Sequence, residues 1–436
     1  MSHGQEVYSK DDIQKIVEAG QFSLPKYTHV AFYILIVLGV LSFLSEFMAS
    51  REGQTHAWMA LHVNFMYWFG AAAASAGFAA VFKICNAQWA RPLKRIFESS
   101  ILFLAVSPLF IIVMYFGAGS IYEWAVHPIP GKAMWLSPLF LYTRDFVAVC
   151  LLIWVLGLVI KNSISMDLTA MKRGLVPIGK QSPNYSRWLS KCSPNCIDET
   201  GTPEEAITKI FNRNGTLSPV CVIVFALSMS LLAFDILMSV DPHWYSTMFG
   251  GFYFMSAVYL AVAFAAIGVC IAISQNELFQ GAVKKSTLHD LGKLLLGFGI
   301  FWAYLFWSHY LPIWYGNLPE ETAYMILRLR EYPWRTVAWT VFGMCFVVPF
   351  ILGLSRDVKQ IPVLLALTGL IVAVGLWIQY YLLFAPTIYP NHISINLNDV
   401  GVGLGFLGLY GLLSVKYLTS VPLIPFGDLF RIKEVQ

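Results

Sequence analysis

The stretch Phe234-Asp-Ile-Leu-Met-Ser-Val-Asp-Pro-His-Trp-Tyr-Ser-Thr-Met-Phe-Gly-Gly251 closes one long apolar segment of the chain and opens the next. Asp235 lies inside the first segment, and Asp241, Pro242 and His243 form the link to the second. Carboxylates are costly at membrane depth, so an acid in such a segment is by default a functional-site hypothesis. The alternative is an acid that a neighbouring helix neutralises for packing alone.

The composition predicts a chain that lies mostly within a membrane. Of its 436 residues, 57% are hydrophobic and only 12% are charged, whereas a soluble domain carries about 25% charged residues. Apolar runs of about twenty residues recur from end to end, which predicts an all-α polytopic membrane protein. The ten predicted spans are residues 29–50, 58–82, 98–119, 140–161, 217–240, 251–275, 291–312, 334–354, 362–383 and 400–419.

The positions of Lys and Arg predict the orientation of these spans. Of the 29 Lys and Arg residues, 23 fall in or at the edge of the two terminal segments and the even-numbered connections, and five fall in or at the edge of the odd-numbered connections. Basic residues favour the cytoplasmic side of a membrane. Both termini are therefore predicted to be cytoplasmic.

Three regions follow from this topology: a cytoplasmic N-terminal segment (1–28), a membrane domain (29–420) and a cytoplasmic tail (421–436). No secretory signal pattern precedes the first span. The stretch Lys10–Ala19 is amphipathic and is expected either to lie on the membrane surface or to be a disordered tail.

Two connections between spans have their own composition. Residues 162–216 are rich in Pro, Ser, Asn and charge and predict a long cytoplasmic loop. Within it, Cys192 and Cys196 lack the second ligand pair of a zinc site, so we interpret them as reduced surface thiols. Residues 313–333 are aromatic and acidic, as suits an outer membrane interface and an external partner.

The last span contains Gly403-Leu-Gly-Phe-Leu-Gly408, which spells a dinucleotide-binding fingerprint. A genuine fingerprint follows a strand in a βαβ unit, and this one lies in a predicted membrane helix. Small residues at Gly401, Gly405 and Gly408 are better explained by close packing against another helix.

Most ionisable residues at membrane depth are predicted to lie near the outer ends of the spans. Arg144 is the natural partner for Asp235 or Asp241, because an unpaired charge there would cost several kcal/mol. For His62 and His309, a hydrogen-bonded packing histidine is the favoured interpretation. The outer group comprises Glu46, His62, Arg144, Asp145, Asp235, Asp241, His243 and His309.

The inner half of the membrane domain holds fewer such groups. Glu98 starts the third span, and His289 and Asp290 start the seventh; for these three a hydrated helix end is the favoured interpretation. Tyr304 could carry a hydroxyl group or a water toward the middle, as could three serines. No acid lies in the central turns of any span, so the sequence does not establish a continuous proton path. The serines are Ser228, Ser230 and Ser256.

Three classes of membrane protein fit this pattern to different degrees. A b-type cytochrome needs His pairs at matching depth, but His62 and His309 are the only deep candidates and no span carries two. A secondary transporter or channel would show paired broken helices, and Pro108 and Pro349 only hint at irregularity. The third class is a subunit of a respiratory complex whose redox centres lie on other chains.

Two long motifs favour the third class. They are Asp235-x5-Asp241-Pro-His-Trp-Tyr-Ser-Thr-Met-Phe-Gly250 and Phe306-Trp-Ser-His-Tyr-Leu-Pro-Ile-Trp-Tyr-Gly-Asn-Leu-Pro-Glu-Glu-Thr322. Together they resemble the family of the shorter NrfD-like membrane subunit of alternative complex III, the ActF family (quinone-binding subunit 2). The resemblance covers nearly the whole chain. The chain departs from the family pattern at His309, where Gln would be expected.

The resemblance implies two four-helix bundles, made of spans two to five and six to nine, with two flanking spans. It implies a multi-pass protein of the bacterial inner membrane whose complex oxidises menaquinol. Haem c and iron–sulfur clusters would lie on partner subunits, and no cofactor, metal or nucleic acid would be bound by this chain. The partners implied are the larger NrfD-like subunit, the cytochrome c subunits, the iron–sulfur subunit and membrane lipids.

Within such a complex the larger subunit is expected to oxidise quinol. This chain would carry part of a proton path, be a structural pseudo-twin, or hold a second quinol site. The residues proposed for a proton path are Asp235, Asp241, His243, Arg144, Asp145, His309, Tyr304, Glu98, His289 and Asp290.

We predict that membrane-impermeant reagents will label residues 313–333 from outside the cell and will not reach residues 162–216 or either terminus. The physical reason is the strong bias of Lys and Arg toward one side. Single-cysteine variants in intact and broken cells would provide the measurement. Labelling of position 180 or 191 from outside would contradict the predicted orientation.

Overall fold

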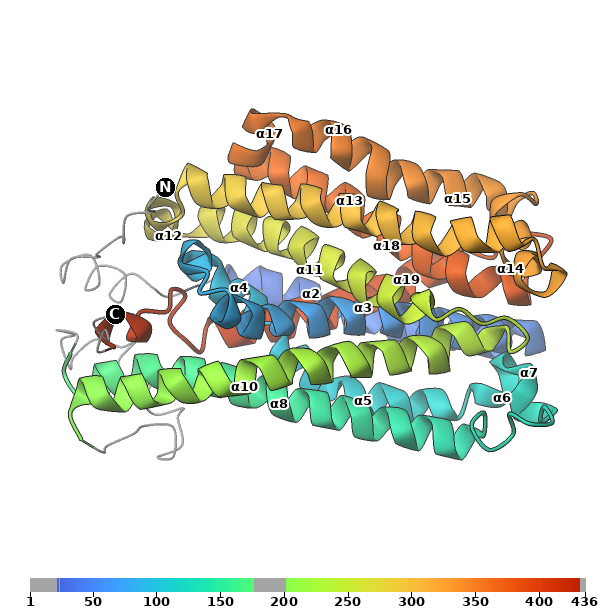
Figure 1. Ribbon diagram of the computed structural model, residues 1–436, viewed down its shortest axis with the longest axis horizontal. Helices are drawn as coiled ribbons and strands as arrows, with labels where there is room; N and C mark the ends of the chain where they lie inside the picture. The colour runs from blue at the N-terminus through green and yellow to red at the C-terminus, as the bar shows by residue number, and fades with distance from the viewer. Residues whose placement is uncertain (1–21, 23, 176–200, 432–436) are drawn as a thin grey trace.

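The computed structural model describes residues 22, 24–175 and 201–431, and every regular element in this part of the chain is a helix. Within these described residues, nine helices are long and apolar enough to cross a membrane, or ten if a pair bent by 40° counts as one span. The helices lie side by side along the long axis of the molecule (Figure 1). The predicted all-α polytopic class is therefore confirmed.

The first half of the described chain contains α2 (Lys26–Ala49), α3 (Arg51–Ile84), η1 (Gln88–Leu93), α4 (Lys94–Glu98), α5 (Ile101–Tyr115), α6 (Ala118–Ile121), α7 (Glu123–Val126), α8 (Pro138–Lys172), α10 (Pro203–Leu232), η3 (Ala233–Leu237) and η4 (Met238–Val240). The second half contains α11 (Met248–Gln275), α12 (Glu277–Ala282), α13 (Lys285–Gly316), α14 (Pro319–Leu329), α15 (Trp334–Phe342), η5 (Gly343–Val347), α16 (Val348–Leu354), α17 (Arg356–Gln360), α18 (Pro362–Ile388), α19 (Leu397–Leu418) and η6 (Gly427–Phe430).

The long connection predicted over residues 162–216 is shorter than expected. Helix α8 continues to Lys172, and α10 already begins at Pro203. A capping box starts α10, because the Thr202 hydroxyl accepts from the Glu205 amide while the Glu205 carboxylate accepts from the Thr202 amide. Residues 162–172 and 203–216 are therefore the ends of two long helices, and residues 176–200 lie outside the described part of the chain.

Three groups of helices pack against one another. One group contains α3, α5, α8 and α10, and another contains α11, α13, α18 and the α15–α16 span. Helices α2 and α19 pack together and against α3. Helix α3 is the centre of this arrangement, since it contacts members of every group and is almost entirely buried.

The two ends of the molecule differ in their elements. We call the end with α4, α12, α17 and η6 the inner end, and the end with α6, α7 and α14 the outer end (Figure 1). The names follow the predicted orientation.

Several predictions fall outside the described residues: the amphipathic stretch Lys10–Ala19 and the thiols of Cys192 and Cys196. The five described cysteines are free thiols.

The glycines of the last span mediate close helix contact, as the sequence predicts. A Cβ atom added to Gly405 would lie 2.7 Å from the Gly39 Cα atom, and one added to Gly401 would lie 2.0 Å from the Ser42 hydroxyl. At Gly408 the added atom would meet the Phe32 carbonyl oxygen at 2.7 Å. The backbones of α2 and α19 therefore touch where both sequences are small.

We predict that Gly405→Ala destabilises the protein by about 1–3 kcal/mol, because two backbones must separate to admit the methyl group. Gly297→Ala is the matched control, since Gly297 is also helical and a Cβ there meets nothing within 4 Å. The control should be neutral or stabilising by about 0.5–1 kcal/mol, as expected for Gly→Ala in a helix. Unfolding of the purified chain in mixed micelles measures both, and equal effects would contradict the packing argument.

Candidate functional site

Asp235 lies in a break of regular helix near the outer end. Helix α10 changes into the π-helical turn η3 at Ala233 and then into the 3₁₀ turn η4. The Ser239 hydroxyl donates to the Asp235 carbonyl oxygen at 2.5 Å, which holds the turn. Single π-turns inside α-helices are frequent at functional sites, because the extra residue re-aims a side chain.

The Asp235 carboxylate forms an ion pair with Arg144 of α8, so the predicted pairing is confirmed. Both Nε and Nη2 of Arg144 donate to Asp235 Oδ2, at 2.8 and 2.6 Å. Asp235 is buried, and the Arg144 side chain is 14% exposed. The guanidinium also lies 3.7 Å from the centre of the Trp135 ring, which adds a cation–π contact to the pair.

Asp145 places a second carboxyl group beside this pair. It is fully buried, and neither of its carboxyl oxygens has a hydrogen-bond donor among the described residues. Asp235 Oδ1 also lacks a donor there. Asp145 interacts electrostatically with both Asp235 and Arg144. We call Asp145, Arg144 and Asp235 the outer triad; it is electroneutral only when one of its two carboxyl groups carries a proton.

Residues adjoining the outer triad form hydrogen bonds that hold it in place. His62 Nδ1 lies 2.7 Å from the Trp58 carbonyl oxygen, and His62 Nε2 lies 2.9 Å from the Tyr142 hydroxyl. Because a carbonyl only accepts, Nδ1 carries the proton and Nε2 of the neutral ring accepts from Tyr142. The Tyr122 hydroxyl donates to the Ile236 carbonyl oxygen at 2.9 Å. His62 is thus a hydrogen-bonded packing histidine, as favoured from the sequence.

The other outer residues lie in a separate cluster. Asp241 interacts electrostatically with Arg328 and Tyr324, so it is not a partner of Arg144. Arg328 is buried and donates to the carbonyl oxygens of Leu382 and Leu383, at 3.1 and 2.9 Å. Burial lowers the pKa of Arg328 and raises that of Tyr324.

His243, His309 and Tyr304 do not join the outer triad. His243 is exposed at the outer end. His309 is buried, its ring centre lies 5.4 Å from that of Trp244, and its Nε2 has no partner among the described residues, so it is not a hydrogen-bonded histidine through that atom. The expectation for Tyr304 is wrong: it is 59% exposed, because it lies on the face of α13 opposite the buried positions Trp302 and Leu305.

Glu98 is not a hydrated helix end, as the sequence had suggested, but is fully buried. Arg95 bonds to both Glu98 and Asp167, and the Tyr417 hydroxyl donates to Glu98 Oε2 at 3.0 Å. Asp167 Oδ1 accepts from the backbone amides of Phe426 and Gly427 at 3.0 and 2.7 Å. We call Arg95, Glu98 and Asp167 the inner triad. Sequence analysis missed it because Asp167 fell in a predicted loop.

The remaining inner residues fit the hydrated interpretation better. Asp290 pairs with Lys293 at 2.6 Å, and the lysine side chain is 57% exposed. His289 is half-buried.

A third polar cluster links α3, α18 and α19 and was also missed. The Tyr381 hydroxyl donates to Asp399 Oδ1 at 3.0 Å and accepts from Asn64 Nδ2 at 3.0 Å. His56 Nε2 lies 3.4 Å from Asp399 Oδ2, and His56 Nδ1 lies 3.5 Å from Glu46 Oε1. Hydrogen bonds thus link Asn64, Tyr381 and Asp399, and His56 lies at ion-pair distance from Asp399 and Glu46. Of this cluster, the sequence had drawn attention only to Glu46.

The described residues define a polytopic α-helical membrane protein with buried ion-paired clusters toward both ends. Among them, no three His, Cys, Asp or Glu side chains are grouped so as to hold a metal ion. No family model matches the chain, and the comparison with curated proteins finds no match either. The assignment of function therefore rests on the geometry of the clusters and on the motifs.

We predict that Arg144→Ala destabilises the protein by about 3–5 kcal/mol, because it leaves the buried Asp235 without its cation. Adding Asp235→Asn should restore part of this loss, since the amide needs no counter-ion. Lys293→Ala breaks an exposed ion pair and serves as the control, with an effect of at most about 1 kcal/mol. Unfolding in mixed micelles gives all three values; an Arg144→Ala effect as small as the control would refute a buried ion pair.

Proposed function

We propose that this chain is an integral membrane subunit of a respiratory quinol:electron-acceptor oxidoreductase of the alternative complex III type. It supports menaquinol oxidation and carries part of a proton-translocation path, and it is not an enzyme by itself. The observation that carries the proton part is the outer triad, in which two buried carboxyl groups share one arginine.

The chemistry of the outer triad suits a group that holds and releases one proton. Arg144 donates twice to Asp235 Oδ2, which favours the ionised form of Asp235. The proton of the electroneutral triad therefore belongs on Asp145. From there it can form a hydrogen bond to Asp235 Oδ1, which pairs an oxygen that otherwise has no donor. Loss of that proton leaves a net negative charge in a buried site, so a new proton is readily taken up.

Two further features support the family assignment. The grouping of α3, α5, α8 and α10, and of α11, α13, α15–α16 and α18, is what two NrfD-like bundles with α2 and α19 as flanking helices would give. The two motifs quoted from the sequence lie in or beside η3 and α13, at the outer end. On this proposal the protein lies in the bacterial inner membrane with its inner end in the cytoplasm.

The partners proposed are the other subunits of that complex: the larger NrfD-like subunit, the cytochrome c subunits with haem c, and the iron–sulfur subunit. A second quinol site on this chain is the competing hypothesis. Photo-crosslinking of the whole complex with an azidoquinone separates the two. Labelling confined to the larger subunit would favour the proton role, and labelling of α8, α10 or α13 would favour the quinol site.

We predict that Asp235→Asn and Asp145→Asn lower the number of protons released per electron by the whole complex in proteoliposomes, with a smaller effect on electron transfer. Each change removes one of the two carboxyl groups that share the proton and keeps the side-chain shape. Asp357→Asn is the matched control, since Asp357 lies in α17 at the inner end, is exposed and is not among the proposed path residues.

An unchanged proton-to-electron ratio in both triad variants, with normal turnover, would show that the outer triad only stabilises packing. A fall of equal size in Asp357→Asn would show that the ratio reports general surface charge. Absence of quinol oxidation from any complex that contains the wild-type chain would refute the respiratory assignment itself.

A further inference from the structure

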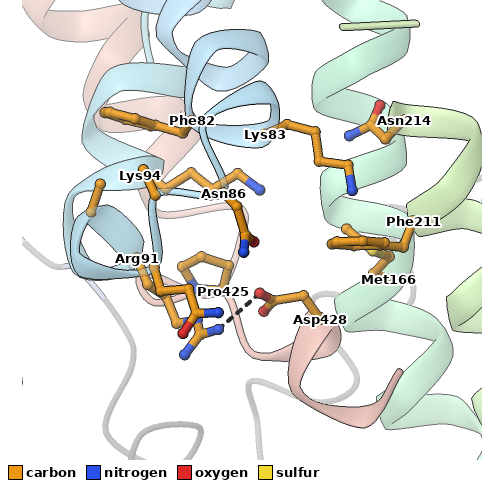
Figure 2. A pocket seen from close by; sticks show the side chains of 13 residues that line it. Phe82, Lys83, Asn86, Arg91, Lys94, Met166, Phe211, Asn214, Pro425 and Asp428 are labelled. Atoms are coloured by element: carbon orange, nitrogen blue, oxygen red, sulfur yellow. Dashed lines mark hydrogen bonds and ion pairs between the residues drawn. The ribbon is translucent and has the colours of Figure 1, made fainter. Parts of the chain in front are cut away.

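A pocket at the inner end lies between the end of α3, the η1 segment, α10 and the residues around η6. Its cavity is about 60 Å³, well above the roughly 10–15 Å³ that one water requires. Figure 2 shows the side chains of Lys83, Lys94 and Asn86 extending into this space, with Phe211 on the opposite wall. The pocket thus admits a group larger than a single water.

The lining of the pocket carries more positive than negative charge. Its charged residues are three cations, Lys83, Arg91 and Lys94, and one acid, Asp428. Asp428 is already paired, because its Oδ2 accepts from Arg91 Nη2 at 2.9 Å. The negative charge of Asp428 therefore offsets that of Arg91, and neither lysine forms an ion pair with this acid.

The nearest acid to Lys94 does not balance that lysine well. Lys94 Nζ lies 3.9 Å from Glu98 Oε1, at the limit of an ion pair. Glu98 also belongs to the inner triad, where it is bonded to Arg95. The Lys94 ammonium is thus only weakly paired.

Lys83 forms no direct ion pair with a carboxylate among the described residues, although Asp428 attracts it electrostatically, and it lies against a second cation. Its Nζ lies over the Phe211 ring, 2.8 Å from the ring centre, and the guanidinium of Arg431 lies 4.2 Å from the same centre. Two cations that share one aromatic ring repel each other, and a half-buried site screens that repulsion poorly. An anion between them would remove this cost.

We propose that this pocket binds the phosphate group of an anionic ligand, with Lys83 and Lys94 as its main contacts. Lys83 lies in the last turn of α3, where a membrane helix ends at the level of the lipid headgroups. Basic pockets between helix ends on the cytoplasmic side bind anionic headgroups through the same charges that would bind a soluble phosphate compound. A lipid headgroup and a soluble phosphate compound would both fit this site, and the experiment below distinguishes them. This site is independent of the respiratory proposal.

The test uses the full-length chain in nanodiscs of phosphatidylcholine alone or mixed with phosphatidylglycerol. If a lipid headgroup is the ligand, phosphatidylglycerol raises the midpoint of thermal unfolding, and native mass spectrometry finds a retained anionic lipid. If a soluble phosphate compound is the ligand, inorganic phosphate raises the midpoint in phosphatidylcholine alone. No shift of the wild-type protein in either arm overturns the proposal, whatever the variants do.

The variant Lys83→Gln/Lys94→Gln should weaken the affinity for the active ligand roughly fivefold for each lysine removed. Lys416→Gln is the matched control: Lys416 lies at the same end, is exposed and does not line the pocket. Its affinity should equal that of the wild type. Unchanged affinity in the double variant, or an equal loss in Lys416→Gln, would show that only general surface charge binds the anion and would overturn the site.

Discussion

Burying a charge away from water is energetically costly, and this cost governs the structure. Within the stretch from Phe234 to Gly251, the ion pair between Arg144 and Asp235 offsets it. A carboxylate inside a membrane helix is stable only beside a cation or with a proton bound. Arg144 reaches Asp235 because α8 and α10 pack together and because the π-helical turn η3 re-aims the side chain. The packing of one bundle and the geometry of the motif thus depend on the same contact.

The inner and outer triads have the same composition, one arginine and two carboxyl groups, but not the same hydrogen bonds. In the inner triad, Tyr417 and the amides of Phe426 and Gly427 donate to the carboxylates. The inner carboxyl groups are therefore held by donors from several elements. In the outer triad, Asp145 receives no hydrogen bond from the described residues. This difference in hydrogen bonding makes the outer triad the candidate for holding a proton.

The sequence predicted the parts of this structure that depend on local pattern. Apolar runs located the spans, small residues predicted a close helix contact for α19, and the cost of a lone acid predicted Arg144 as the partner of Asp235 or Asp241. The inner triad could not be predicted, because Asp167 lies in a polar stretch whose helical state depends on packing. Tyr304 was misplaced because its face of α13 is set by neighbours that a single sequence does not reveal. The fold was thus more predictable than the site.

The inner triad also determines where the last described residues lie, and through them the charge of the anion pocket. Asp167 binds the amides of Phe426 and Gly427, and a Cβ atom at Gly427 would lie 2.3 Å from the Met166 carbonyl carbon. These contacts fix the segment that follows Phe426. They thereby place Asp428 beside Arg91 and Arg431 over the Phe211 ring. One buried arginine therefore organises a terminal segment that looked like a tail, and the excess of positive charge beside Lys83 follows from it.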